Sequence, residues 1–195
     1  MNEVAYEGEK VFHSNPSGID NTVSTFGGAV IFKKGESPVS IEGKIPMKVI
    51  IIDTGVPRRT KEAVESVKRL LDEHPSEIQE AFSQMDKIAT DAFSVLKNPC
   101  LETHKSLEVL VENNQKLLAE TLHVSHPSLD KAIDLCHQNG LCAKLTGAGC
   151  GGSAFAFVPP QMKDDSISIL QKALNDIGMS SFVTSLCSDG VSLSF

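Results

Sequence analysis

The pattern of apolar and polar positions changes several times along the 195-residue chain, and each change predicts a different element. The run from Met47 to Ile52 is short, apolar and rich in branched side chains, which is typical of a buried strand. From Thr60 onward, apolar residues recur at the spacing of a helix face. The segments expected to be helical are Thr60 to His74, Ser76 to Asn98, a stretch that includes residues 107–118, Pro127 to Asn139, and residues 164–177.

The second half of the chain also contains predicted strands. These are Cys142 to Leu145, Ala154 to Val158, Phe182 to Leu186 and Val191 to Phe195. From residue 48 onward the order is therefore strand, helices, strand, strand, helix, strand. This is the split βαβ, or ferredoxin-like, arrangement with extra helices inserted in the first crossover. The predicted fold class is α+β.

The N-terminal segment has a different character. Val23 to Phe32 is rich in β-branched and aromatic residues and contains glycine, which predicts a strand pair or a strand with a bulge. The pattern changes near Pro46, so we place a boundary there, with residues 1–46 in one unit and residues 47–195 in another. A segment of this length is too short to bury a core of its own.

Composition narrows the class of protein. The chain is 41% hydrophobic and 22% charged, and its formal net charge of -7 argues against a fold-wide affinity for nucleic acid or an acidic membrane surface. It contains 5 cysteines, without a CxxC pair or a secretory leader, which indicates reduced intracellular thiols. No apolar run approaches the ~18 residues of a membrane-spanning helix. We therefore expect a cytoplasmic protein without nucleic-acid or membrane partners.

A glycine-rich loop lies between two predicted strands, in the sequence Thr146-Gly-Ala-Gly-Cys-Gly-Gly152. Its spacing matches the dinucleotide-binding pattern, but the loop leads into a strand, and no acid follows at the distance that a ribose contact requires. It also lacks the Lys-Ser/Thr ending of a Walker loop. Two interpretations remain open: an anion-binding nest of N–H groups, or a tight hairpin without a ligand.

A second motif restricts the backbone before an acid. Pro16 fixes its own φ and favours an extended Asn15, while Gly18 permits a turn that other residues avoid. Asp20 then lies where a short helix is expected to begin. A carboxylate held there can accept a proton from a substrate hydroxyl. The alternative is that Asp20 only caps the helix.

The two motifs together resemble the GHMP kinase superfamily. The matching segments are His13 to Asn21 and Lys144 to Gly152, and two further segments, Gly8 to Lys10 and Asp53 to Arg58, are most similar to its mevalonate kinase branch. The resemblance implies a GHMP-type C-terminal domain preceded by the tail of an N-terminal domain. It also implies ATP-dependent phosphorylation of mevalonate, a step in isoprenoid and sterol precursor synthesis, by a homodimeric enzyme that uses Mg²⁺.

The resemblance also implies roles for individual residues. Asp20 corresponds to the catalytic acid and Glu9 to a magnesium ligand. His13 and Thr54 would lie near the substrate. The nucleotide phosphates would lie beside Thr146, Gly147, Ala148 and Gly149. Simpler roles stay open: Glu9 as an exposed helix charge, Thr54 as a strand-end cap, and His13 as a partner of the local backbone. Cys150 departs from the glycine that is usual in the family.

One family motif is absent from this sequence. The N-terminal domain of these kinases carries a Pro-x-x-x-Gly-Leu-Gly-Ser-Ser loop that binds the phosphates. We therefore expect the chain to be a C-terminal portion with little turnover of its own, and with apolar side chains exposed on residues 1–45. The alternatives are a non-catalytic ferredoxin-like module, or a GHMP kinase for galactose, homoserine or phosphomevalonate.

Overall fold

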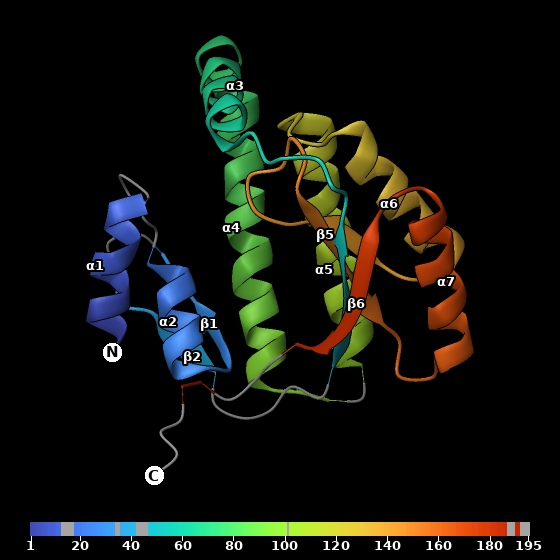
Figure 1. Ribbon diagram of the computed structural model, residues 1–195. Coiled ribbons are helices and arrows are strands. Elements are labelled where there is room, and N and C mark those ends of the chain that lie inside the picture. The colour runs from blue at the N-terminus through green and yellow to red at the C-terminus, as the bar shows by residue number, and fades with distance from the viewer. Residues whose placement is uncertain (13–17, 34–35, 42–46, 101, 187–189, 192–195) are drawn as a thin grey trace.

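The computed structural model describes residues 1–12, 18–33, 36–41, 47–100, 102–186 and 190–191 (Figure 1). Its elements are, in chain order, α1 (Asn2–Phe12), α2 (Ile19–Phe26), β1 (Ala29–Ile31), β2 (Val39–Ile41), β3 (Lys48–Asp53), α3 (Thr60–Glu73), α4 (Pro75–Lys97), α5 (Thr103–Lys116), η1 (Leu117–Thr121), α6 (Pro127–Gln138), β4 (Ala143–Leu145), β5 (Ser153–Val158), α7 (Asp164–Asp176) and β6 (Ser180–Ser185). Within these ranges, no helix is long and apolar enough to cross a membrane.

The larger sheet has the strand order β4-β5-β3-β6. All its neighbouring strands are antiparallel, and β3 lies between β5 and β6 in register. The first strand in sequence, β3, and the third, β5, are therefore central, and the second and fourth are at the edges. This is the ferredoxin-like order, so the predicted α+β class is confirmed.

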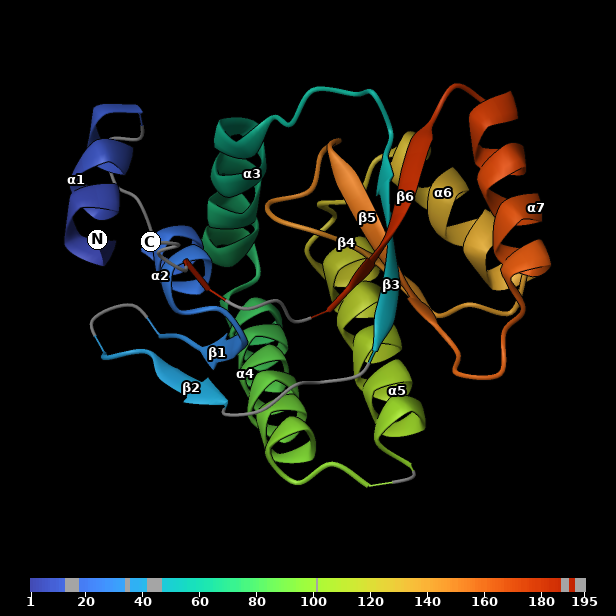
Figure 2. The ribbon, with the colours of Figure 1, turned by 60° about the horizontal axis from the view of Figure 1, so that its bottom comes forward.

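Helices cover both faces of this sheet, and Figure 2 shows α6 and α7 on one side and α4 and α5 on the other. Alternation along β3 explains this, because successive side chains point to opposite faces. Ile50 and Ile52 belong to the larger core cluster with Leu129 of α6 and Leu170 of α7. The other face contributes a second cluster: Met47, Val49, Leu107, Cys142 and Phe157.

The helices predicted after residue 60 are confirmed. Pro75 begins α4 at a position where its missing N–H costs nothing. Helix α6 ends before Asn139 and Gly140, as expected. The pattern did not predict that α5 passes into a π-helical turn, η1. Leu118, within this turn, and Leu122, directly after it, belong to the main core cluster.

Two expected strands differ from the structure. Residues 23–26 are helical, and only Ala29–Ile31 forms a strand in the segment predicted as a strand pair. Thr22 explains part of this, because its hydroxyl donates to the carbonyl of Gly18 at 2.6 Å and supports the first helical turn. Val191 is not in a strand. Its N–H donates to the Thr25 carbonyl of α2 at 3.1 Å, and residues 192–195 lie outside the described part.

The N-terminal elements lie outside the large sheet. Strands β1 and β2 pair only with each other in the described chain, and Figures 1 and 2 both show this N-terminal part to one side of α4, with α1 farthest from it. Large apolar side chains of this part are exposed, as expected: Val4 is 76% exposed, Val11 79% and Phe26 63%. The proposed boundary after residue 46 stays a prediction.

Candidate active site

The first part of the candidate site is the pair of helices α1 and α2. The Asn21 amide donates to the Asn2 side chain at 2.6 Å. The Tyr6 ring lies 3.4 Å from the point that a Cβ on Gly18 would occupy. The start of α1, at Asn2, thus contacts Asn21 within α2, whereas Tyr6, one turn later, contacts Gly18 at the start of α2. The two helices therefore run in opposite directions.

Glu9 lies on the face of α1 that makes these contacts. Asn2, Tyr6 and Glu9 are spaced by four and three residues, which places them on one helix face, and all three are partly buried. Glu9 is one turn beyond Tyr6, toward the end where α2 begins. Asp20 lies in the first turn of α2. Both predicted carboxylates therefore lie at the same end of the helix pair.

Asp20 is exposed and is not the cap of its helix. Gly18 occupies the N-cap position with a φ of 82°. The interpretation of Asp20 as an N-cap is therefore wrong. A carboxylate in the first turn still interacts favourably with the unpaired N–H groups of the helix start, and it remains accessible to a substrate.

Glu9 has the chemistry of a magnesium ligand. Its neighbour Lys10 pairs with Glu7 at 2.6 Å, and in the described part of the chain no basic side chain pairs with Glu9. A partly buried carboxylate that no described basic side chain neutralises fits Mg²⁺, which takes one or two protein carboxylates and completes its shell with water and phosphate. Among the described residues no group of three or more His, Cys, Asp or Glu could hold a metal. His13 lies outside the described residues.

The second part of the site lies at the end of the large sheet. Thr54 follows β3, is 7% exposed, and donates its hydroxyl to the Gly152 carbonyl at 2.6 Å. Its backbone N–H donates to the same carbonyl at 3.1 Å. The predicted substrate residue thus contacts the end of the glycine-rich loop. The strand-end role that the sequence left open is present, and the substrate contact stays a prediction.

The second half of the glycine-rich loop is bound to neighbouring segments. The Cys150 N–H donates to the Val124 carbonyl at 2.7 Å, and the Gly152 N–H donates to the Val56 carbonyl at 2.8 Å. Cys150 adopts a φ of 53°, a left-handed backbone conformation that glycine adopts more readily than other residues. These bonds fix the loop between the segment after β3 and the segment after η1.

The first half of the loop differs from the second in its hydrogen bonds, and it runs from the exposed Gly147 to the buried Gly149. Thr146 uses its N–H and its hydroxyl on the Ser153 carbonyl, at 2.9 and 3.2 Å. The N–H groups of Gly147, Ala148 and Gly149 donate to no group in the described part of the protein. Successive unpaired N–H groups in a glycine-containing bend can bind an anion. The structure therefore favours the anion-binding interpretation over a hairpin that is closed by its own hydrogen bonds.

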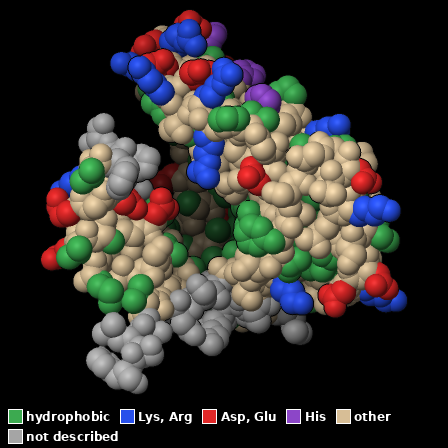
Figure 3. Space-filling view, viewed as in Figure 1, with side chains coloured by type: hydrophobic (Ala, Val, Ile, Leu, Met, Phe, Trp, Pro, Cys, Tyr) green, Lys and Arg blue, Asp and Glu red, His purple; other side chains and the backbone are tan. Residues whose placement is uncertain are grey.

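A hollow separates the N-terminal part from the sheet part. Figure 3 shows acidic side chains on its N-terminal wall, Lys or Arg side chains next to acidic atoms on the opposite upper rim, and apolar side chains at its base. An acidic wall facing a basic rim suits a reaction that activates a neutral alcohol on one side and binds an anionic group on the other.

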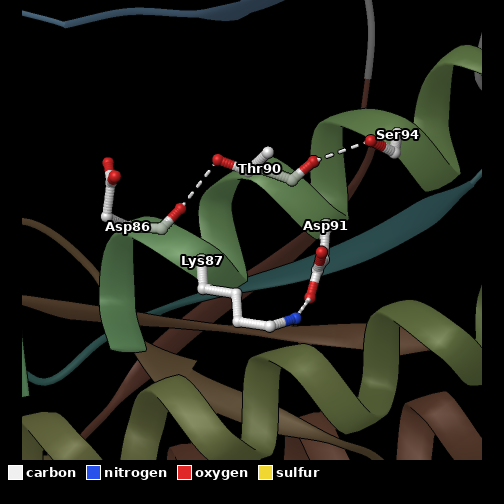
Figure 4. Close-up of polar contacts among 5 residues, drawn as sticks. All are labelled: Asp86, Lys87, Thr90, Asp91 and Ser94. Atoms are coloured by element: carbon white, nitrogen blue, oxygen red, sulfur yellow. Dashed lines mark hydrogen bonds and ion pairs between the residues drawn. The ribbon is translucent and has the colours of Figure 1, made fainter. Parts of the chain in front are cut away.

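A different cavity lies between α4 and the α5–η1 segment, with a volume of about 490 Å³. None of the predicted site residues lines it. Two of its charged residues pair with each other, Lys87 with Asp91 at 2.7 Å (Figure 4). On another side of α4 the hydroxyls of Thr90 and Ser94 donate to carbonyls of their own helix. This cavity has the character of a surface groove between helices and does not belong to the candidate site.

One basic residue at the site was given no role from the sequence, although it ends the matching segment Asp53 to Arg58. Arg58 lies beside the glycine-rich loop, with its Nη1 3.7 Å from the point that a Cβ on Gly147 would occupy. Most arginines on a protein surface are solvated. Only the folded structure shows that Arg58 lies beside the loop, whereas Arg59 pairs with Glu62. The available signal was its position four residues after Thr54.

Comparisons with known proteins agree with this arrangement. The family model for the C-terminal domain of GHMP kinases matches residues 95–175. The chain is 35% identical to mevalonate kinase of Bos taurus over 99% of the chain and 49% of that protein. It is 38% identical to mevalonate kinase of Candida albicans over 96% of the chain and 46% of that protein. The chain thus spans about half the length of the curated relatives it matches.

Solved structures of mevalonate kinases are also similar to this chain. Mevalonate kinase of L. major in complex with R-mevalonate superposes with a TM-score of 0.80 and 25% identity, over 98% of this chain and 58% of that chain. Mevalonate kinase of Methanococcus jannaschii gives a TM-score of 0.75 and 25% identity, over 96% of this chain and 55% of that chain. This chain therefore carries a match to the C-terminal domain of the GHMP kinases and is similar, over nearly its whole length, to a C-terminal portion of the mevalonate kinases.

Proposed function

We propose that the chain supplies the alcohol-activating acid and one phosphate-binding loop of an ATP-dependent mevalonate kinase. The observation that best supports this is the pair of hydrogen bonds from Thr54 to Gly152, at 2.6 and 3.1 Å. These bonds join the segment after β3 to a loop whose first half has N–H groups that no described residue accepts. The hollow with an acidic and a basic side supports the same proposal (Figure 3).

Each group has a defined task in this proposal. Asp20 accepts the proton of the substrate hydroxyl, which makes the oxygen a better nucleophile. The N–H groups of Gly147, Ala148 and Gly149 neutralise charge on the phosphates. Bound Mg²⁺, held by Glu9, would balance further negative charge. Such alignment and charge neutralisation are what phosphoryl transfer mainly requires from a protein.

The experiment places this chain in a complete enzyme. The half of the Bos taurus relative that the chain does not match is fused in front of it, and ADP formation is measured with ATP, Mg²⁺ and mevalonate. We expect mevalonate-dependent ADP formation by the fusion and little by the 195-residue chain alone. Asp20→Asn should lower kcat by about 100-fold or more, the usual contribution of a positioned general base.

Asp165 provides the control. It is also an exposed acid in the first turn of a helix, α7, which begins beyond the end of β5 that lies away from the glycine-rich loop. Asp165→Asn should match Asp20→Asn in its effect on stability and leave turnover unchanged. Full turnover by the Asp20→Asn fusion would return Asp20 to a surface role. Absence of mevalonate-dependent turnover in the unsubstituted fusion would favour the non-catalytic alternative or another alcohol substrate.

A further inference from the structure

The side-chain amide of Asn21 joins α2 to the start of α1. Asn21 is only 6% exposed, and its Nδ2 donates to the Asn2 Oδ1 at 2.6 Å and to the Asn2 main-chain carbonyl at 3.4 Å. Because that carbonyl can only accept a hydrogen bond, the nitrogen of the amide must face α1. One turn further along α1, the Tyr6 ring lies against Gly18. Two contacts at successive turns thus fix how far α1 is shifted along α2.

Stability alone does not account for this amide. The Asn21 Oδ1 is buried and has no hydrogen-bond partner in the described part of the chain. A buried acceptor without a partner costs at least as much free energy as a typical hydrogen bond contributes, and an apolar side chain of the same size would avoid that cost. In coiled coils a single buried Asn fixes the register of paired helices at a similar cost in stability.

The register of α1 on α2 matters because the two predicted carboxylates lie at one end of this helix pair. Glu9 is one turn beyond Tyr6, and Asp20 is in the first turn of α2. Two carboxylates repel each other, so this end needs contacts elsewhere to stay together. A shift of α1 by one residue would move Glu9 along α2 by about 1.5 Å. A displacement of about 1 Å at a catalytic group can lower the rate about 100-fold.

We infer that Asn21 is a positioning residue, which holds α1 in register on α2 and so sets the Glu9 carboxylate relative to Asp20. This inference rests on the proposed function and deepens it. Asn21 itself touches neither the alcohol nor the metal. The distance between the acid that activates the alcohol and the carboxylate that holds Mg²⁺ depends on its amide.

The experiment uses the fusion with the Bos taurus half. Asn21→Leu removes the amide, together with its unpaired acceptor, at nearly the same volume. The probe is Mn²⁺ in the presence of ADP, and its dissociation constant is measured from the relaxation of water protons, a readout that needs no turnover. We expect this constant to rise about tenfold, as is usual when a group that orients a metal ligand is lost. The apparent KM for Mg²⁺ in the ADP-formation assay should rise by a similar factor.

Three further variants separate the register from folding. Asn2→Leu removes the other half of the contact and should weaken Mn²⁺ binding as much as Asn21→Leu does, with no additional loss in the double variant. Asn2→Asp keeps an acceptor for the Asn21 amide and should bind Mn²⁺ like the unsubstituted fusion. The matched control is Thr22→Val, because Thr22 is also buried on α2 but donates its hydroxyl within that helix, to the Gly18 carbonyl at 2.6 Å. It should lower the urea midpoint and leave Mn²⁺ binding unchanged, whereas Asn21→Leu should do the reverse.

Unchanged Mn²⁺ binding in Asn21→Leu and Asn2→Leu would overturn the inference and leave the proposed function intact, because that function is tested separately through mevalonate-dependent turnover and Asp20. Asn2 is only partly buried, so Asn2→Leu decides the question if Asn21→Leu does not fold. An equal loss of Mn²⁺ affinity in Thr22→Val would reduce Asn21 to a structural role and overturn the inference as well. If the unsubstituted fusion binds no Mn²⁺ with ADP, the inference fails together with the magnesium role of Glu9.

Discussion

At Gly149 the backbone φ is 78°, and a Cβ would overlap the carbonyl oxygen of Val124. Gly149→Ala therefore combines backbone strain with a steric clash that only a shift of the loop can relieve. We expect it to lower the free energy of unfolding by about 3 kcal/mol. Urea denaturation of the purified chain measures this change.

Gly55 is a matched control for this substitution. Its φ of 70° is close to that of Gly149, but nothing lies within 4 Å of the Cβ that alanine would add. Gly55→Ala should therefore cost only the strain of the left-handed backbone, about 1 kcal/mol. Equal losses in the two variants would show that the contact with Val124 does not constrain the loop.

At the scale of elements, the two edge strands of the large sheet differ in their exposure to solvent. Strand β6 lies at one edge, and most of its residues are exposed. Strand β4 lies at the other edge, where Gln115 of α5 accepts the Leu145 N–H at 2.9 Å. Gln115 is 7% exposed and Leu145 is fully buried. Helix α5 thus covers this edge and satisfies a donor that water cannot reach.

Gln115→Met should therefore leave a buried N–H unpaired. We expect a loss of about 2 kcal/mol in the free energy of unfolding and faster hydrogen exchange at the Leu145 amide. Gln84 is the control, since it is exposed on α4 and its amide donates to Glu80 at 2.9 Å. Gln84→Met should change stability by less than about 0.5 kcal/mol. Similar losses in both variants would contradict the role given to Gln115.

Much of the element order follows from local pattern. The apolar run predicts β3 because this strand buries both of its faces. The helical spacing after Thr60 predicts the helices because each of them buries one continuous face. With the ferredoxin-like order known, the antiparallel pairing of β3 with β5 brings Asp53 opposite Ser153. The contact between Thr54 and Gly152 then follows from topology, although the residues are 98 positions apart.

Other features depend on contacts that no local pattern contains. Val23 favours a strand by its branched side chain, but Gly27, with a φ of 71°, ends a helix after Phe26. Leu118 of the π-helical turn η1 packs into the main core cluster, so this turn depends on contacts with segments that are distant in the sequence. The two halves of the glycine-rich loop look alike in sequence, and only the carbonyls of Val56 and Val124 distinguish the bound half from the free half.

At the scale of the whole molecule, one buried charge should affect the dependence of stability on pH. Lys144 is partly buried on β4, with its Nζ 2.8 Å from the Leu145 carbonyl and 5.7 Å from the centre of the Phe155 ring. None of the described acids pairs with it. Burial lowers the pKa of Lys144 from 10.5 to about 8.

The sign of the effect follows from proton binding. Below pH 8 both the folded and the unfolded chain hold the lysine proton, and the folded chain bears the cost of a buried charge. Between pH 8 and 10.5 the unfolded chain binds more protons, so this residue makes stability rise with pH. Burial raises the pKa of the Cys136 thiol from 9.0 to about 12, which makes stability fall above pH 9. The two contributions oppose each other.

The difference between Lys144→Met and the unsubstituted chain isolates the lysine. At pH 7 the variant should be more stable by on the order of 2 kcal/mol, a value reduced from the full pKa shift because the side chain is partly exposed. This advantage should shrink as pH rises from 8 and disappear near 10.5, since the unsubstituted chain then buries a neutral amine. Urea denaturation at several pH values measures both curves. Parallel curves across that range would mean that the Lys144 ammonium is solvated in the folded protein, and its burial on β4 would then carry no energetic cost.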